Sequence, residues 1–258
     1  MSSVIDALAC PSIRCTALTF APADTAIGSA ESTSASRQTW MSFSAVLRAC
    51  ADVLALVAAD VAEKSRVEPA SLSLDGNRLR SADGQVDVAM LDAVAGEIYE
   101  ATHEYHHAPT HALDENGQGD AHVSVAFAAH RAVVDVDSEL GLIRVIEVTT
   151  AQDVGRVLNP LQAVGQVEGG IAQGVGLAVM EEIVVDGGHI RNPSFTDYLI
   201  PTALDMPVVT IAALVEEPEP GAPFGAKGIG EPPTISSTAA VAAAVRDATG
   251  LPLPRVPI

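Results

Sequence analysis

Basic residues are scarce in this chain. Its 258 residues include 14 lysines and arginines against 33 aspartates and glutamates, so the formal net charge is −19. Proteins that bind nucleic acid or anionic membranes carry a basic patch that attracts phosphate. The acidic balance therefore argues against both kinds of partner. A phosphate-bearing ligand would have to be held by fixed hydrogen-bond donors, because the overall field of the protein repels it.

Cysteines and long apolar runs are also few. Three cysteines, Cys10, Cys15 and Cys50, fit a reducing compartment better than a disulfide scaffold. Cys10 and Cys15 have the first spacing of a plant-type iron–sulfur run, but the closely spaced third cysteine is missing. No run approaches the roughly 20 apolar residues of a membrane span, and no basic residue precedes Cys10 as a secretion signal would require. We therefore expect a cytoplasmic protein.

Apolar residues, at 48% of the chain, are sufficient for a globular core in one large domain or two smaller ones. Helical and strand patterns mix without regular alternation, which predicts the α+β class with antiparallel strands. Periodicity near 3.6 and helix-stop residues predict helices at about Met41–Ser65, Val88–Ala101 and Gly165–Met180, and after Pro233, the last one capped by Ser236 or Ser237 and ended by Gly250.

Alternating patterns predict the strands. We expect a helix and a short strand before Phe20, two strands between Leu72 and Val86 around a turn at Asp75–Asn77, a hairpin over 122–137 and 142–150, a strand pair around Asp186–Gly188, and a strand at 208–215.

The sequence G-I-G-E-P-P at 228–233 holds one carboxylate, Glu231, on an unusual backbone. Glycines let a main chain approach a ligand closely, and Pro232 and Pro233 stiffen the chain directly after the carboxylate. This is a way to fix a general base. The same pattern is also typical of a plain surface turn.

A second segment, 153–176, is rich in glycine around Gln166. A carboxamide offers both a donor and an acceptor to a ligand, and helical glycines indicate close backbone approach, either to a ligand or to another helix in the core. Asp153, Arg156 and Asn159 precede it and are expected to fix the loop by side-chain to backbone bonds. His130, on a strand, is expected to be a packing residue.

A third segment, S-T-S-A-S-R-Q-T at 32–39, is small and hydroxylated, with one guanidinium at Arg37. Where such a loop enters a helix, main-chain donors and a charged fork can hold phosphate. On chemistry alone, a capped helix start with an exposed arginine explains the pattern equally.

These segments together resemble a known family. The blocks at 32–39, 153–176, 192–201 and 225–233 are similar, in order, to the second, C-terminal cofactor-binding domain of the molybdenum-binding subunit of the xanthine dehydrogenase and aldehyde oxidase family. The resemblance implies that residues 1–258 form this second molybdopterin-binding domain, in two lobes of about 1–100 and 101–258, and that the first such domain is absent from this chain.

The resemblance also implies roles for residues. Glu231 would be the general base of an oxidative hydroxylation of an N-heterocycle or aldehyde, with water as the oxygen source. The cofactor would be molybdenum-molybdopterin, in its plain or cytosine dinucleotide form. The residues matching the family's cofactor contacts are Gly165, Gln166, Ala35, Ser36, Arg37, Gln38, Thr39, Gly228 and Gly230; no side chain is expected to bind the metal directly.

The need for partner chains is inferred from motifs that the sequence lacks. It has no nucleotide fingerprint, flavin motif or cluster cysteine set, so iron–sulfur clusters and FAD would lie on other chains. Another chain would supply the first molybdopterin-binding domain. The family's second domain normally opens with a G-Q-G turn, and this chain starts after it, so it is expected to be half of a split subunit or an inactive remnant or interaction domain.

One motif points to a different enzyme. His103, Glu104 and His107 match H-E-x-x-H, which on a helix places two histidines one turn apart for zinc, with the glutamate as base. Pro109 comes directly afterwards and no third ligand motif is evident. A zinc metallopeptidase is therefore the minor alternative; the family pattern makes this stretch a strand edge.

Overall fold

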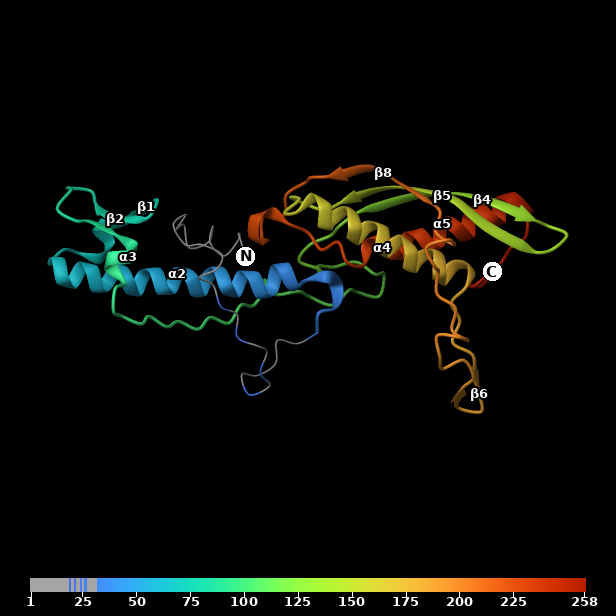
Figure 1. The fold of residues 1–258 in the computed structure, drawn as a ribbon, viewed down its shortest axis with the longest axis horizontal. Coiled ribbons are helices and arrows are strands. Elements are labelled where there is room, and N and C mark those ends of the chain that lie inside the picture. Colours follow the sequence, from blue (N-terminus) through green and yellow to red (C-terminus); the bar gives the residue numbers. More distant parts are fainter. Residues whose placement is uncertain (1–18, 20, 22–23, 25, 27–31) are drawn as a thin grey trace. The chain divides into compact units, whose positions relative to one another are not determined.

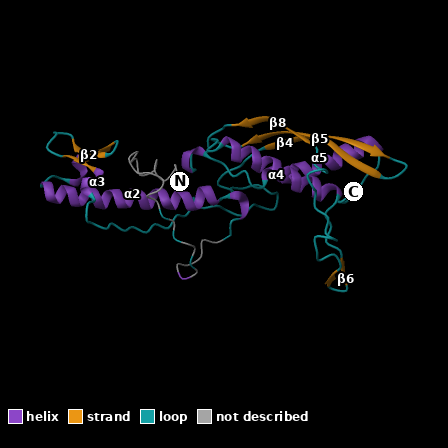
Figure 2. Ribbon diagram, viewed as in Figure 1, coloured by secondary structure: helices purple, strands orange, loops and turns teal. Residues whose placement is uncertain are grey.

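The computed structural model describes Thr19, Ala21, Asp24, Ala26 and residues 32–258. The chain divides into two compact units, unit 1 with residues 1–32 and 41–107, and unit 2 with residues 33–40 and 108–258. Figure 1 traces the chain in sequence order and Figure 2 marks its helices and strands. Apart from Thr19, the helix and strand expected before Phe20 lie outside the described residues, as do Cys10 and Cys15.

Unit 1 contains most of helix α2 (Gln38–Ser65), which confirms the helix predicted from Met41. After the short turn η4 (Pro69–Ser71), strands β1 (Leu72–Asp75), β2 (Arg78–Ser81) and β3 (Asp87–Ala89) pair antiparallel in that order, with the predicted turn between β1 and β2. The core of this unit joins helix and sheet through Val57, Val61, Leu79, Val86, Met90 and Ala93.

The helix predicted over Val88–Ala101 is wrong. Its first residues form β3, and helix α3 covers only Met90–Ala93. Gly96 adopts a φ of +80°, a left-handed conformation that ends a helix. Beyond it Tyr99 donates a hydrogen bond to Asp60 of α2, 2.6 Å away, which holds the chain off the helical path. Bonds from Lys64 and then Tyr99 keep the pKa of Asp60 below its usual value.

The H-E-x-x-H stretch is not helical. Between Glu97 and Phe127 the chain contains no helix and no strand, so the expected strand edge is absent too. His103 instead places its Nδ1 3.1 Å from an Asp52 carboxylate oxygen. Within the described residues no group of three histidines, cysteines or carboxylates could hold a metal. The geometry that a zinc peptidase needs is therefore not formed here.

Unit 2 is built on a three-stranded sheet of order β4-β5-β8. Strands β4 (Ala128–Asp137) and β5 (Leu142–Asp153) form the predicted antiparallel hairpin, although β4 begins at Ala128 and not at residue 122. Strand β8 (Val208–Val215) is also where it was predicted, but it pairs with β5 in parallel. The α+β class is confirmed, with one parallel pairing among the antiparallel ones. The small hairpin of β6 (Val185–Asp186) and β7 (His189–Ile190) also confirms its prediction.

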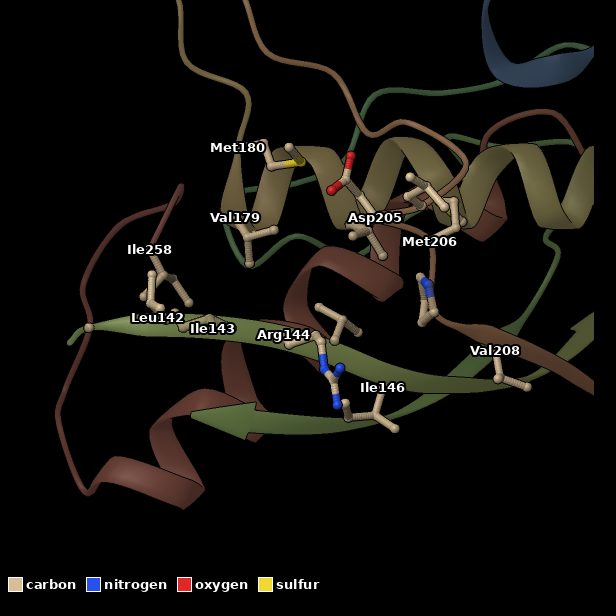
Figure 3. A pocket seen from close by; sticks show the side chains of 15 residues that line it. Leu142, Ile143, Arg144, Ile146, Val179, Met180, Asp205, Met206, Val208 and Ile258 are labelled. Atoms are coloured by element: carbon tan, nitrogen blue, oxygen red, sulfur yellow. The ribbon is translucent and has the colours of Figure 1, made fainter. Parts of the chain in front are cut away.

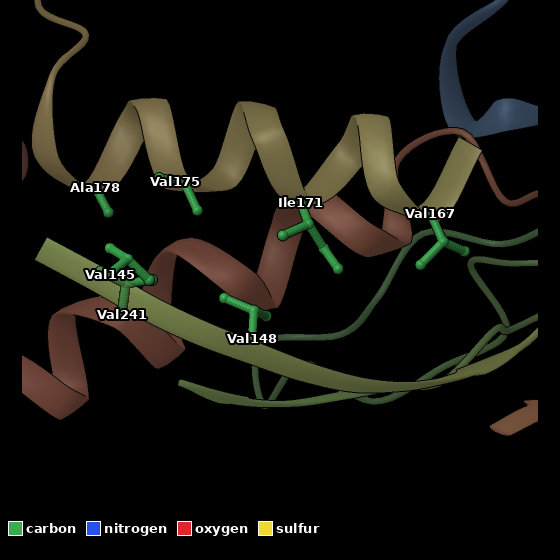
Figure 4. Close-up of a cluster of buried hydrophobic side chains, with 7 residues drawn as sticks. All are labelled: Val145, Val148, Val167, Ile171, Val175, Ala178 and Val241. Atoms are coloured by element: carbon green, nitrogen blue, oxygen red, sulfur yellow. The ribbon is translucent and has the colours of Figure 1, made fainter. Parts of the chain in front are cut away.

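Two helices cover one face of this sheet, α4 (Pro160–Val179) and α5 (Pro232–Thr249). Figure 4 shows the core between them, where apolar side chains of α4 and α5 meet those of β5. Burial of such side chains is the main favourable term in folding. The buried residues are Val145, Val148, Val167, Ile171, Val175, Ala178 and Val241.

Glycines form the contact between α4 and α5. A Cβ at Gly170 would meet the Pro233 ring, and one at Gly174 would overlap Ser237 Oγ. The close approach lets Thr234 donate to the Gly170 carbonyl at 3.1 Å and Thr238 to the Gly174 carbonyl at 3.0 Å. At these two positions the glycines therefore serve helix packing, whereas Gly165 and Gly169 have nothing within 4 Å of an added Cβ.

Gly174→Ala should destabilise the protein by about 1–3 kcal/mol, because the added methyl group overpacks the α4–α5 contact. Gly169→Ala is the matched control on the same helix. Its methyl group meets nothing within 4 Å, so better helix propensity should stabilise the protein by about 0.8–1 kcal/mol. Chemical denaturation measures both. Effects of the same sign would show that the contact does not depend on glycine.

Helix α5 starts differently from the prediction. Its N-cap is Glu231, and Pro232 and Pro233 occupy the first turn, where proline loses no helical hydrogen bond. Ser237, one of the two predicted caps, is fully buried inside the helix and donates to the Pro233 carbonyl at 2.7 Å. The predicted end is confirmed, with Gly250 at a φ of +70°.

His130 is held in a polar cluster between β4 and α5, as expected of a packing residue. Its Nδ1 lies 2.8 Å from Ser236 Oγ, and its Nε2 lies 3.2 Å from the carboxamide nitrogen of buried Gln152. That nitrogen also donates to Thr150 Oγ1 at 2.7 Å. Burial lowers the pKa of His130, which favours the neutral ring.

Candidate functional site

A pocket of about 520 Å³ in unit 2 gathers three distant parts of the sequence. The first is the turn η3 (Ser34–Ser36) with the start of α2, the second runs from the end of β5 into α4, and the third is the loop before α5. The lining residues are Thr33, Ser36, Gln38, Thr39, Val154, Arg156, Val157, Leu158, Asn159, Gln162, Ala163, Gln166, Ala226, Lys227, Gly228, Ile229 and Gly230.

Side-chain and backbone bonds join the end of β5 to the loop before α5, next to the pocket. Lys227 donates to Asp153 at 2.6 Å, and both side chains are only 9% exposed. Backbone bonds run from Lys227 N to the Val154 carbonyl and from Arg156 N to the Gly225 carbonyl. Gly155 has a φ of +58°, and a Cβ there would collide with that same carbonyl. The short turn η5 (Pro223–Gly225) precedes this junction.

Helix α4 presents two carboxamides to the pocket. Asn159 caps the helix by accepting a bond from Gln162 N at 3.1 Å, and Asp153 accepts one from Gly155 N at 3.2 Å. Both confirm the bonding expected of this loop. Gln162 and Gln166 are four residues apart and so share one helix face. Gln166 is exposed, which leaves its donor and acceptor open to a ligand.

Glu231 lies at the junction of the first and third parts. Its carboxylate is exposed and makes no capping bond to α5. It accepts instead from Ala35 N at 3.2 Å on one oxygen and from Ser36 Oγ at 3.3 Å on the other. Ser36 Oγ accepts in turn from Glu231 N at 2.9 Å. A Cβ at Gly228 or Gly230 would strike Ser36, so these glycines permit the two loops to touch.

Several groups that line the pocket favour an anion, although the chain as a whole is strongly acidic. The first residues of α2 and of α4 line it, and α5 starts next to it. Helix N-termini carry partial positive charge, which suits an anion. Helix α5 contributes no N–H group from its first two residues, because both are prolines. Arg156 adds a full charge: it lines the pocket and is exposed, and within the described part of the chain its guanidinium has no bonding partner.

The predicted site residues fall into three groups. Those that line the pocket are Ser36, Gln38, Thr39, Gln166, Gly228 and Gly230. Ala35 and Glu231 are bonded to each other beside it. Arg37 and Gly165 are not among the lining residues, although Arg37 lies between two residues that are. An added Cβ at Gly165 would meet nothing within 4 Å.

Sequence reasoning overlooked the roles of Gln162, Arg156 and Lys227 in this pocket. Gln162 could have been found, because it precedes Gln166 by one helical turn. Arg156 was assigned only to fixing the loop, and that assignment is wrong for its side chain, since its guanidinium makes no bond within the described residues. Lys227 lies in the same block as Glu231, but its partner Asp153 is 74 residues away, and no local pattern reveals such a pair.

A second hollow of about 610 Å³ contains none of the predicted site residues. Figure 3 shows it between the first half of β5, the end of α4, the segment before β8 and Ile258. Most of its lining residues are of apolar types, and Arg144 and Asp205 carry the charged side chains among them. It offers no arrangement of titratable groups for chemistry.

In the described part of the chain, no helix is long and apolar enough to cross a membrane.

Comparisons with known proteins agree with the resemblance read from the sequence. The family model of the molybdopterin cofactor-binding domain matches residues 4–207. The chain is 39% identical over 135 residues to the putative xanthine dehydrogenase molybdenum-binding subunit of Escherichia coli (strain K12), which covers 52% of this chain and 18% of that protein. It is 30% identical over 190 residues to an aldehyde oxidoreductase molybdenum-binding subunit of Escherichia coli O157:H7, covering 73% and 26%.

A solved structure is similar over nearly the whole chain. The aldehyde oxidoreductase from Desulfovibrio gigas matches with a TM-score of 0.74 and 28% identity, covering 99% of this chain and 26% of that one. The chain thus spans about a quarter or less of the length of these relatives. The match of the family model to well over half of the residues establishes that the chain belongs to the family of molybdopterin cofactor-binding domains.

Proposed function

We propose that this chain supplies part of the molybdopterin site of a molybdenum hydroxylase, with Glu231 as its general base. The observation that carries the proposal is the convergence of residues 33–39, 154–166 and 226–231 on one pocket. These are the same segments that resemble the family's cofactor-contacting motifs. The substrate class would be an N-heterocycle or an aldehyde, hydroxylated with oxygen from water.

The donors in the pocket suit a pterin that carries phosphate. Gln162 and Gln166 offer carboxamides, each with a donor and an acceptor for the polar edge of a pterin ring. Thr39 adds a hydroxyl, and Arg156 and the helix N-termini supply positive charge for the phosphate. A nucleotide tail would extend beyond these groups. Nothing in this donor set conflicts with the plain cofactor or with its cytosine dinucleotide form.

The bound molybdenum cofactor would supply the oxygen transfer and accept the two electrons of the reaction. The overall change converts a C–H group and water to a C–OH group, two protons and two electrons. Glu231 would take one proton on a carboxylate oxygen from the attacking water-derived oxygen, a step that typically contributes about 10²–10⁴ in rate. Gln166 and Gln162 would orient the cofactor, and the stiff Pro232–Pro233 backbone would hold the base.

The proposal requires partner chains. A first molybdopterin-binding domain, which the resemblance pairs with this one, would complete the site. The two electrons would leave through iron–sulfur clusters and FAD on further chains. The segment between α4 and β8 exposes several apolar side chains, which a partner chain would cover. They include Ile183, Val185, Phe195, Leu199 and Leu204.

The test is to purify the tagged full chain from the cells that produce it and to measure molybdenum and pterin per chain. The proposal expects both in a complex with further chains. A well-behaved monomer without molybdenum would favour the inactive remnant or interaction domain instead.

In that complex, Gln166→Ala should lower molybdenum occupancy or slow turnover by about five- to tenfold, because one donor and one acceptor vanish together and leave ligand groups unpaired. Gln118→Ala is the control, since Gln118 lies in an exposed turn outside the pocket. Metal analysis and steady-state kinetics decide the result. Full occupancy with unchanged kinetics would leave Gln166 as a surface residue without a role in binding.

A further inference from the structure

The Ser36 hydroxyl both donates to and accepts from a single residue, Glu231. A serine hydroxyl has a single proton to donate. Ser36 Oγ donates that proton to a carboxylate oxygen of Glu231 at 3.3 Å, and Ser36 Oγ also accepts from Glu231 N at 2.9 Å. Ala35 N binds the second carboxylate oxygen at 3.2 Å. Ala35 and Ser36 thus bind both carboxylate oxygens of Glu231, and Ser36 also binds its backbone N–H. Ser36 and Glu231 are 195 residues apart in sequence, and we call this set of bonds the grip.

The backbone at this contact is strained. Ala35 has a φ of +62° and Ser36 a φ of +51°, a left-handed conformation that is uncommon for residues other than glycine. Such strain persists only where surrounding contacts enforce it, and it concentrates at functional sites. The surrounding contact comes from the loop that carries Glu231: Gly228 and Gly230 lie so close to Ser36 that an added Cβ on either would come within 2.6 Å of it.

From this geometry we infer that Ser36 is a positioning residue for Glu231 and not a donor to the cofactor. The resemblance alone counts Ser36 among the cofactor contacts. The structure assigns its hydroxyl proton to the carboxylate, so Ser36 fixes the direction in which Glu231 faces the pocket. The effect of Ser36 on catalysis rests on the proposed function, in which Glu231 is the general base. The bonds between Ser36 and Glu231 do not depend on that function.

Two substitutions separate the hydroxyl from the backbone conformation. Ser36→Ala removes the hydroxyl and keeps the strained φ, whereas Ser36→Gly removes the hydroxyl and relieves the strain. If the hydroxyl positions Glu231, both variants should lower kcat about tenfold or more with little change in KM, because small misplacement of a reacting group is costly. Ser138→Gly in the exposed β4–β5 turn is the matched control and should keep the wild-type kcat.

A second readout needs no cofactor. Amide hydrogen exchange of Glu231 in the purified full chain should accelerate about tenfold in both variants, since its acceptor is gone. Pro232 and Pro233 have no amide hydrogen, so a peptide over residues 228–234 reports few other amides. Retained protection in both variants would overturn the grip. Faster exchange with unchanged kcat would overturn the positioning role.

The two failures are distinguishable. If Glu231→Gln retained full turnover, the proposed function would fail, yet the exchange experiment would still decide the grip. If Glu231→Gln abolished turnover while Ser36→Gly did not lower it, the general base would stand and the positioning role of Ser36 would be refuted.

Discussion

Glu231→Gln should reduce turnover of the assembled enzyme by about 10²–10⁴-fold while its molybdenum content stays near that of the wild type. The amide has nearly the same shape as the carboxylate and its oxygen can still accept from Ala35 N or from Ser36, so the loops should stay joined. It cannot take up a proton as a base. Removing a negative charge beside a pocket suited to an anion should not weaken cofactor binding either.

Turnover and metal content must therefore be measured on the same preparation. Glu139→Gln makes the same change of charge in the exposed β4–β5 turn, outside the pocket, and should behave as wild type. Activity of Glu231→Gln within tenfold of wild type would remove Glu231 from the role of general base. Loss of molybdenum along with activity would instead assign Glu231 to holding the pocket together.

Local rules predicted most of unit 2 correctly. The hairpin of β4 and β5, helix α4, strand β8 and the end of α5 at Gly250 are all predictable from periodicity and turn residues over short distances. The failures arose where distant contacts decide. The segment after Met90 leaves its predicted helix because Tyr99 bonds to Asp60, and β8 pairs in parallel because α4 carries the chain across the sheet before it returns.

The site could be predicted only in part for the same reason. Glycine and proline patterns singled out Glu231, and the small polar loop singled out Ser36. Which group each would meet depends on folding that brings residues 35 and 231 together, and no spacing rule encodes that contact. The sequence therefore singled out the carboxylate as a candidate, but it did not reveal the bond from the Ser36 hydroxyl to that carboxylate.

Lys227→Met should destabilise the protein by about 3 kcal/mol, because it leaves the Asp153 carboxylate buried without its counter-charge. Methionine nearly matches lysine in length, so lost packing contributes little. The lysine and aspartate side chains are each 9% exposed and lie 2.6 Å apart. Since this pair joins the end of β5 to the loop that leads to Glu231, part of the loss should appear as faster hydrogen exchange of residues 226–231 before global unfolding.

A second substitution distinguishes loss of the pair from loss of lysine alone. In Lys227→Met with Asp153→Asn, the uncompensated charge is gone, and the asparagine oxygen can still accept from Gly155 N. The double variant should therefore recover much of the stability, with a coupling energy of about 1–3 kcal/mol in a double-mutant cycle. Chemical denaturation of the four proteins measures it. Additive losses would mean that the two charges do not depend on each other, and that backbone bonds from Lys227 N and Arg156 N alone hold the base of the pocket closed.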